Sequence, residues 1–331
     1  MRTSSILALT LTAILGTGCL AAPSDSPVDN FEAIWQEFDE HYGGFDDRGI
    51  DWEDSYERWR PQLDEGSSED ELWGVLTGML AELDDGHVKL VAPGREFFDA
   101  NEVYRDKIDD DSFDLDIVRE HYLSDERVEL WGDELWYVWG EVAPGVAYVW
   151  FNWIDDNTYV IDEIVDSGVE HIIVDLRHNG GGAYTYALHG FGRVTAEDVD
   201  VFRSRSRNGP AHDDWDEWWT TTMPARGETF DGALTVLTDA WSMSATERLI
   251  MALQEVEGVV TVGVPSNGSQ ATMIGREAPN RWTYSLAVQE VEGMDGSRYE
   301  GAGIPVDIEI RNDPDVLAGG TDEVLEAALA L

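Results

Sequence analysis

The chain has 331 residues, of which 43% are hydrophobic, so it can bury a large core in one large or two closely packed domains. Its 21 basic and 68 acidic residues give a formal net charge of −47, which argues against binding to nucleic acid or to an anionic lipid surface. We attribute this charge to adaptation to saline surroundings, with steering of basic substrates as the alternative.

The N-terminal segment, residues 1–18, is typical of a secretory signal peptide, because Arg2 is followed by an apolar run and then by small residues. The run is too short for a membrane span, and no later segment approaches one. Cys19 is the only cysteine and stands where a bacterial lipoprotein is cleaved and acylated. We expect an exported protein: a periplasmic or outer-membrane-anchored lipoprotein held through Cys19, or a secreted protein cleaved after "CLAA".

A linker over residues 19–29 leads into a predicted N-terminal helical bundle over residues 30–92. Apolar residues at helical spacing predict helices within 29–42, 52–63 and 67–83. The bundle ends in "DDGH", which places His87 on a loop. Residues 93–127 are acidic and irregular, and we interpret them as a connector.

Residues 128–331 alternate between strand-like runs and helical patterns. The alternation predicts an α/β sheet with crossover helices. The strand-like runs are "ELWYVWGEV", "GVAYVWFNW", "HIIVDLR", "ALTVLT", "VVTVGV" and "RWTYSLAVQEV". Residues 204–224 are polar and rich in tryptophan, and we expect a lid or a substrate-binding loop. Trp215, Trp218 and Trp219 would line a substrate groove or pack in the core.

Two segments could carry chemistry. The glycines of "HNGGG", which directly follow a buried strand, allow backbone N–H groups to approach a ligand. In "SMSATE", Ser244 and Glu247 have the spacing of a helix capping box, and the same helix N-terminus would favour negative charge developing beside a nucleophilic serine. Neither segment by itself distinguishes a catalytic role from a structural one. No phosphate loop and no zinc-ligand spacing is present in the sequence.

Taken in order, "DGH", "VDLRHNGGG", "SMSATE" and "YEGAGIPVDIEI" resemble the tail-specific (C-terminal processing) serine protease family, which includes the tricorn protease core. The resemblance covers most of residues 30–312. It implies a crotonase-like mixed α/β core packed on the helical bundle, with the active site between them. It also implies a peptide or protein substrate and no metal or organic cofactor.

The resemblance implies that Ser244 is the nucleophile and that the backbone N–H groups of Gly181 and Ala245 form the oxyanion hole. The processing proteases use a lysine some 25 residues after the serine as the base. Here Lys89 and Lys107 are the only lysines, and both precede the serine, so a serine–lysine dyad of that layout is excluded.

Tricorn-like members use a histidine from the N-terminal region, and the resemblance then implies His87 as the base with Glu300 completing the set. A serine needs such a base because its hydroxyl is weakly nucleophilic at neutral pH. The chain departs from tricorn at Gly86, where tricorn has a serine beside the histidine. It also shows no segment resembling a PDZ domain, so recognition of free C-terminal tails is not implied.

Three residues are candidate accessory residues: Gly180, Ser242 as a fallback nucleophile, and His178 beside the glycines. We predict an exported serine peptidase that cleaves peptide bonds through an acyl-enzyme on Ser244, with His87 as general base. The alternatives are a catalytically inactive lipoprotein that binds a ligand or peptide on the same fold, and a non-peptide esterase or amidase. The sequence does not predict the oligomeric state.

Overall fold

The computed structural model describes residues 23–106 and 111–331, so the predicted signal peptide, Cys19 and Lys107 lie outside the described residues. Over the described ranges the chain is a mixed α/β protein with sheets of seven, four and three strands. The α/β class expected from the sequence is confirmed. Of the helices in those ranges, none is long and apolar enough to cross a bilayer.

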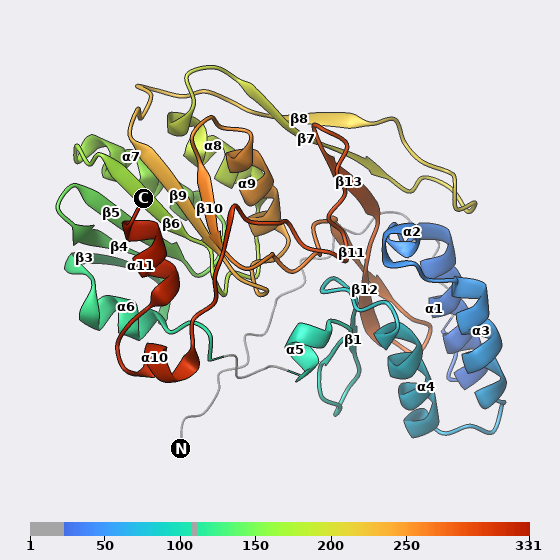
Figure 1. Cartoon of the computed structure of the whole chain (residues 1–331). Helices are drawn as coiled ribbons and strands as arrows, with labels where there is room; N and C mark the ends of the chain where they lie inside the picture. The colour runs from blue at the N-terminus through green and yellow to red at the C-terminus, as the bar shows by residue number, and fades with distance from the viewer. Residues whose placement is uncertain (1–22, 107–110) are drawn as a thin grey trace.

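The central sheet has the strand order β14-β10-β9-β6-β5-β4-β3 (Figure 1). Its first five strands are parallel, and β4 and β3 extend it in antiparallel pairing. Such parallel strands are buried on both faces, which explains continuous apolar runs such as "ALTVLT". The strands are β3 (Ser124–Trp131), β4 (Glu134–Ala143), β5 (Val146–Phe151), β6 (His171–Asp175), β9 (Ala233–Thr238), β10 (Val260–Gly263) and β14 (Ile308–Glu309).

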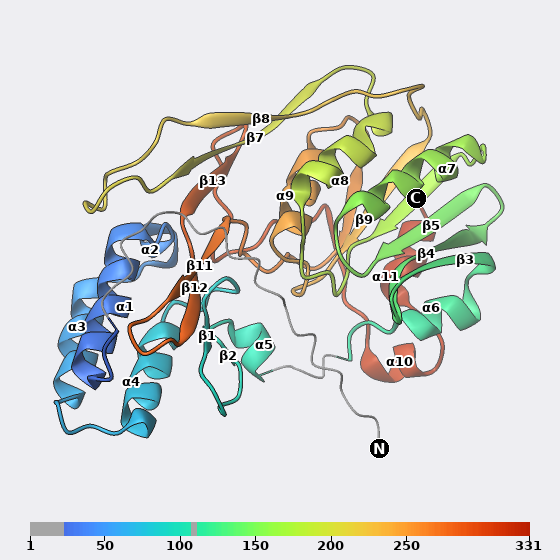
Figure 2. The ribbon, with the colours of Figure 1, turned by 180° about the vertical axis from the view of Figure 1, so that it is seen from behind.

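Helices cover both faces of the central sheet (Figures 1 and 2). Neighbouring residues of β5 point to opposite faces: Val149 packs with α7, α8 and α9, whereas Trp150 packs with α6 and α11. The helices are α6 (Leu115–His121), α7 (Val160–Asp166), α8 (Tyr184–Gly190), α9 (Ala245–Gln254), α10 (Pro314–Ala318) and α11 (Glu323–Leu329), with 3₁₀ turns η2 (Asp156–Tyr159) and η3 (Phe191–Val194).

The N-terminal helices pack against a second, antiparallel sheet with the order β11-β12-β1-β2. Phe38 and Leu76 of the helices share one hydrophobic cluster with Tyr284 and Leu286 of β12, so a late segment of the chain returns to the N-terminal part. The elements here are α1 (Pro27–His41), α2 (Phe45–Arg48), α3 (Trp52–Trp59), η1 (Arg60–Gln62), α4 (Glu69–Ala81), α5 (Glu102–Asp106), β1 (Lys89–Val91), β2 (Phe98–Asp99), β11 (Met273–Glu277) and β12 (Thr283–Ala287).

The sequence analysis divided the chain into consecutive segments at residues 92 and 127, and this division did not predict that β11 and β12 pack with the N-terminal helices. The segment predicted to be an irregular connector contains β2, α5, α6 and the beginning of β3. Its acidic residues are compatible with short capped helices, as at Asp114, whose side chain accepts the N–H of Asp116 at the start of α6.

A third sheet has the order β13-β7-β8, from β7 (Val199–Ser206), β8 (Trp219–Met223) and β13 (Gln289–Gly293). Its long β7–β8 ribbon runs from the central sheet towards the N-terminal helices (Figure 1). The segment predicted as a lid or substrate loop thus forms the end of β7, a connection and β8. Trp215 and Trp218 each stack 4.7 Å from the Arg205 guanidinium, whereas Trp219 is 73% exposed.

Candidate active site

The turn between β9 and α9 carries Ser244. Ser244 has a φ of 61°, a left-handed conformation that is costly for a residue with a side chain. A strained turn between a strand and a helix is the geometry that exposes a nucleophilic hydroxyl in other hydrolases. Glu247, one turn into the helix, accepts the Ser244 backbone N–H at 3.0 Å and fixes this conformation.

His87 approaches this serine from the loop after α4. Its side chain is almost fully buried, and its Nε2 lies 3.0 Å from Ser244 Oγ. Burial lowers the pKa of His87 to about 4, against the opposing attraction of the Asp85 carboxylate. The imidazole is therefore neutral near pH 7, the form that can accept a proton from the hydroxyl. Two of the predicted residues, from segments 157 positions apart, are brought together.

Glu300 does not contact the imidazole. Its Oε1 accepts a hydrogen bond from Arg48 at 2.9 Å, and its Oε2 accepts the backbone N–H groups of Gln270 and Ala271. Within the part of the chain that the structure describes, His87 Nδ1 has no hydrogen-bond partner. Glu300, which the resemblance implied as the third member of the set, is thus connected to His87 only through other residues.

Those other residues, Arg48, Asp85 and Tyr42, were missed in the sequence. Asp85 Oδ1 accepts the backbone N–H of His87 at 2.7 Å, and its Oδ2 accepts the Tyr42 hydroxyl at 2.7 Å. The Arg48 Nε lies 3.8 Å from Asp85 Oδ2, so Arg48 bridges Asp85 and Glu300. The one available hint was the position of Asp85, two residues before the histidine in "DDGH".

The two carboxyl groups in this network differ in their ionisation. Burial alone would raise the pKa of Asp85, but the positive charge of Arg48 and the nearby His87 hold it below its ordinary value. Burial, and then the charge of Asp85, raise the pKa of Glu300 to about 8, with Arg48 opposing. At neutral pH the network therefore carries its negative charge on Asp85, the carboxyl nearer to the histidine.

The glycine turn after β6 lies against Ser244. A Cβ added to Gly181 would stand 2.7 Å from Ser244 Cβ and 3.1 Å from the Ala245 nitrogen, so only glycine fits there. The Gly181 N–H donates to Asn179 Oδ1 at 2.9 Å. The N–H groups of Gly180 and Ala245 have no hydrogen-bond partner among the described residues. Gly181 is thus close to Ser244, but its N–H is engaged.

Ser242 and Gly86 occupy supporting positions. The Ser242 hydroxyl is fully buried and donates to the Leu176 carbonyl at 2.8 Å, so it stabilises the turn and is not presented to a substrate. A Cβ on Gly86 would meet Met243 Sδ at 2.4 Å and Ser269 Oγ at 3.0 Å. Ser269 Oγ accepts the Gly86 N–H at 3.0 Å, and thus supplies a hydroxyl beside the position where the resemblance implied a serine.

Metal-binding geometry is absent from this region: residues 23–106 and 111–331 contain no group of three His, Cys, Asp or Glu side chains placed to hold a metal ion. The predicted accessory residue His178 lies at the start of the glycine turn and pairs with Asp239.

Two family models match the sequence. The model of peptidase family S41 matches residues 147–310, and the model of the tricorn protease C1 domain matches residues 23–81. The first match includes the glycine turn (residues 178–182) and the turn that carries the proposed nucleophile (residues 239–244, the nucleophile turn), and the second match includes Arg48.

Solved structures share the fold. A candidate peptidase from Parabacteroides merdae ATCC 43184 superposes with a TM-score of 0.81 at 23% identity, covering 93% of this chain and 96% of that chain. Mature CPAF in complex with lactacystin gives a TM-score of 0.66 at 10% identity over 91% and 97% of the two chains. The tricorn protease gives 0.55 at 12% identity, covering 92% of this chain and 36% of the longer tricorn chain.

Proposed function

The chain belongs to peptidase family S41, and we propose that it hydrolyses peptide bonds through an acyl-enzyme on Ser244, with His87 as general base. The single observation that carries this proposal is the 3.0 Å distance between His87 Nε2 and Ser244 Oγ, with the imidazole held neutral by burial. We further propose that the central sheet and its helices form a crotonase-like core, with the N-terminal helices contributing the base.

In the first step Ser244 Oγ attacks the carbonyl carbon of the substrate while His87 Nε2 takes the hydroxyl proton. The imidazolium then gives that proton to the leaving amine, the C–N bond breaks, and an acyl-serine remains. In the second step His87 deprotonates a water molecule, which attacks the ester carbonyl and releases Ser244. The Asp85 carboxylate, fixed by Arg48 and Tyr42, stabilises the imidazolium that forms in each step.

The oxyanion would form beside two backbone donors. The Ala245 N–H is available at the N-terminus of α9, where the helix dipole also favours negative charge. The Gly181 N–H must leave Asn179 to serve as the second donor, or the neighbouring Gly180 N–H takes its place. In either arrangement the glycine turn lies against the nucleophile, as the mechanism requires.

Peptides or proteins are the proposed substrates, and we propose that the protein is exported, with lipid attachment at Cys19 as its link to a membrane. The strongly acidic composition agrees with a protein that functions in saline surroundings outside the cell.

The test is hydrolysis of a defined mixture of synthetic peptides, read by mass spectrometry, by the wild-type protein and by Ser244→Ala. We expect new termini with the wild type and none with the variant. Cleavage that is equal in the two would trace the activity to a contaminant and contradict the proposal. Hydrolysis of ester substrates without any peptide cleavage would identify the protein as an esterase. Binding of peptides without cleavage would support the inactive binding protein.

A further inference from the structure

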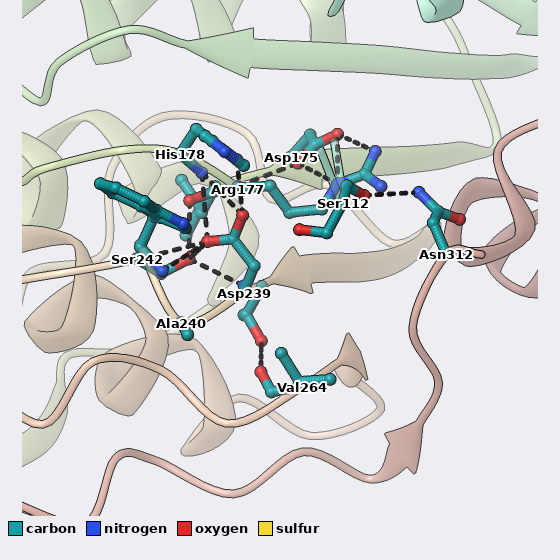
Figure 3. Close-up of polar contacts among 12 residues, drawn as sticks. Ser112, Asp175, Arg177, His178, Asp239, Ala240, Ser242, Val264 and Asn312 are labelled. Atoms are coloured by element: carbon teal, nitrogen blue, oxygen red, sulfur yellow. Dashed lines mark hydrogen bonds and ion pairs between the residues drawn. The ribbon is translucent and has the colours of Figure 1, made fainter. Parts of the chain in front are cut away.

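A buried carboxylate joins the two turns that meet at the active site. Asp239 directly follows β9 and is 5% exposed. It accepts the backbone N–H of His178 at 3.1 Å from the glycine turn. From the nucleophile turn it accepts the N–H groups of Trp241 at 2.9 Å and Ser242 at 3.0 Å. Figure 3 shows Asp239 lying between His178 and Ser242.

The His178 side chain adds a second connection to the same carboxylate. Its Nδ1 lies 2.7 Å from Asp239 Oδ2. The ring stacks on Trp241 at a centroid distance of 5.5 Å with only 14° between the planes, and it also packs at 5.3 Å from Phe113. The imidazole is therefore held in one orientation, with its Nδ1 directed at the carboxylate.

Arg177, the basic residue beside His178 in the sequence, already binds other carboxylates and does not pair with Asp239. Arg177 directly precedes His178, and its guanidinium is bound to Asp175 at 2.5 Å and to Asp322 at 2.8 Å. All three of these side chains are almost fully buried. Asp239 therefore draws its side-chain partner in the glycine turn from His178 and not from Arg177.

A displacement of His178 would change the positions of the proposed oxyanion donors through its neighbour Asn179. Asn179 follows His178, and its Oδ1 accepts both the Gly181 N–H at 2.9 Å and the Thr246 hydroxyl at 2.6 Å. Its backbone carbonyl accepts the Met243 N–H at 3.0 Å. Both turns also contain residues at positive φ: 57° at His178, 109° at Gly181 and 61° at Ser244. Such strained turns persist only when surrounding contacts fix them.

We propose that His178 is a positioning residue for peptide hydrolysis, which holds the glycine turn against the nucleophile turn through its side-chain contact with Asp239. The inference rests on the proposed function, because it concerns the oxyanion donors of that reaction. His178 does no chemistry in this scheme. It keeps the backbone donors within reach of the developing oxyanion, where small displacements reduce the rate strongly.

Three variants separate the side-chain contact from the backbone strain. His178→Asn places an amide at the branch position of Nδ1, and asparagine tolerates the left-handed conformation, so the contact with Asp239 is kept. His178→Gly removes the ring and relieves the strain at the same position. Asp239→Asn removes the charge of the carboxylate while keeping an oxygen acceptor. His41→Gln is the control, since His41 pairs with Glu37 at 3.4 Å on the surface of α1.

The measurement is the rate of serine modification by a fluorophosphonate, resolved into a maximal rate and a half-saturating concentration, with circular dichroism to verify folding. We expect His178→Asn and His41→Gln to react within about threefold of wild type. We expect His178→Gly and Asp239→Asn to lose roughly 10- to 100-fold in maximal rate, with half-saturation almost unchanged.

The outcomes distinguish the two proposals. A folded His178→Gly that reacts like wild type would overturn the positioning role and leave the proposed function standing. An equal loss in His178→Asn and His178→Gly would also overturn it, because the contact with Asp239 would then not be what matters. If wild type itself is not modified at a serine, the proposed function fails, and the positioning role fails with it.

Discussion

At the scale of single residues, the ionisation of His87, the proposed base, is set by burial more than by a partner carboxylate. His87 is 3% exposed, and its Nδ1 lacks a hydrogen-bond partner within the described part of the chain. Its neighbouring carboxylate, Asp85, contacts its backbone N–H instead of its ring. This differs from a triad in which a carboxylate holds the imidazole tautomer.

The low pKa of His87 should set the acid limit of the proposed peptide hydrolysis. Protonation of the imidazole removes its capacity to accept the hydroxyl proton, so kcat/KM should fall as the pH drops through about 4 and stay level from about 5.5 to 7. An exposed histidine would instead give a limb near its ordinary pKa of about 6.5. The check is a pH profile of kcat/KM on a peptide substrate, with folding followed at each pH. A limb at 6.5 would contradict the buried, neutral base.

The two carboxyl groups around Arg48 should respond differently to neutralisation. Glu300 is largely protonated at pH 7 because its pKa is raised to about 8, so Glu300→Gln should keep kcat within about threefold. Asp85 is ionised, and in the proposed mechanism it stabilises the imidazolium, so Asp85→Asn should lower kcat by roughly 10- to 100-fold. Steady-state kinetics at pH 7 of the two variants provides the comparison. The reverse order would assign the catalytic carboxylate to Glu300.

Motifs in the sequence could identify the proposed reacting residues, because each lies in a short segment with its own pattern. Ser244 in "SMSATE" and His87 in "DGH" are of this kind, and the structure brings them to 3.0 Å. Arg48 could not be found this way. It contacts Glu300, which lies 252 positions later in the chain, and no local pattern around "FDDRG" indicates that this arginine is buried.

At the scale of elements, α2 links the N-terminal helices to the site. Arg48, its last residue, hydrogen-bonds the Gly268 carbonyl at 2.6 Å as well as Glu300. Its side chain is 6% exposed, and Asp85 and Glu300 are buried with it. The arginine therefore neutralises a buried carboxylate and connects α2 to the loop before β11.

Removal of that arginine should be costly. Arg48→Ala leaves the buried Asp85 charge without its cation, and such losses destabilise proteins by about 3–5 kcal/mol. Arg58→Ala is the matched control, because Arg58 is 54% exposed in its pair with Glu82 and its removal should change the free energy of unfolding little. Urea unfolding gives both free energies. Equal, small losses in the two variants would contradict a neutralising role for Arg48.

The return of β11 and β12 to the N-terminal part illustrates what sequence patterns omit. The run "RWTYSLAVQEV" was predicted as strand, and the structure divides it between β12 and β13 in two different sheets. The pattern indicates an extended, half-buried segment but not its neighbours. The pairing of Leu90 with Tyr284 depends on long-range packing that no local signal encodes.

At the scale of the whole molecule, the net charge of −47 makes self-repulsion a leading electrostatic cost of folding. The screening length falls from about 10 Å at 0.1 M salt to about 3 Å at 1 M. We therefore expect the Tm to rise by at least about 5 °C between 0.1 and 2 M NaCl, equivalent to roughly 3 kcal/mol at about 2.1 cal/mol/K of unfolding entropy per residue. Calorimetry in NaCl, compared with sucrose of equal osmolality, separates screening from solute exclusion. Equal shifts in the two solutes would argue against charge screening.

At the scale of the whole molecule, we propose above all that the N-terminal helical part and the central sheet together build an activated serine. Its most direct measurement is covalent labelling of the purified protein with a fluorophosphonate, with the modified residue located by mass spectrometry, beside Ser244→Ala and His87→Ala. We expect one phosphonate on Ser244 in the wild type and none in either folded variant. Labelling of Ser242, labelling that persists without His87, or an unreactive folded wild type would contradict the claim.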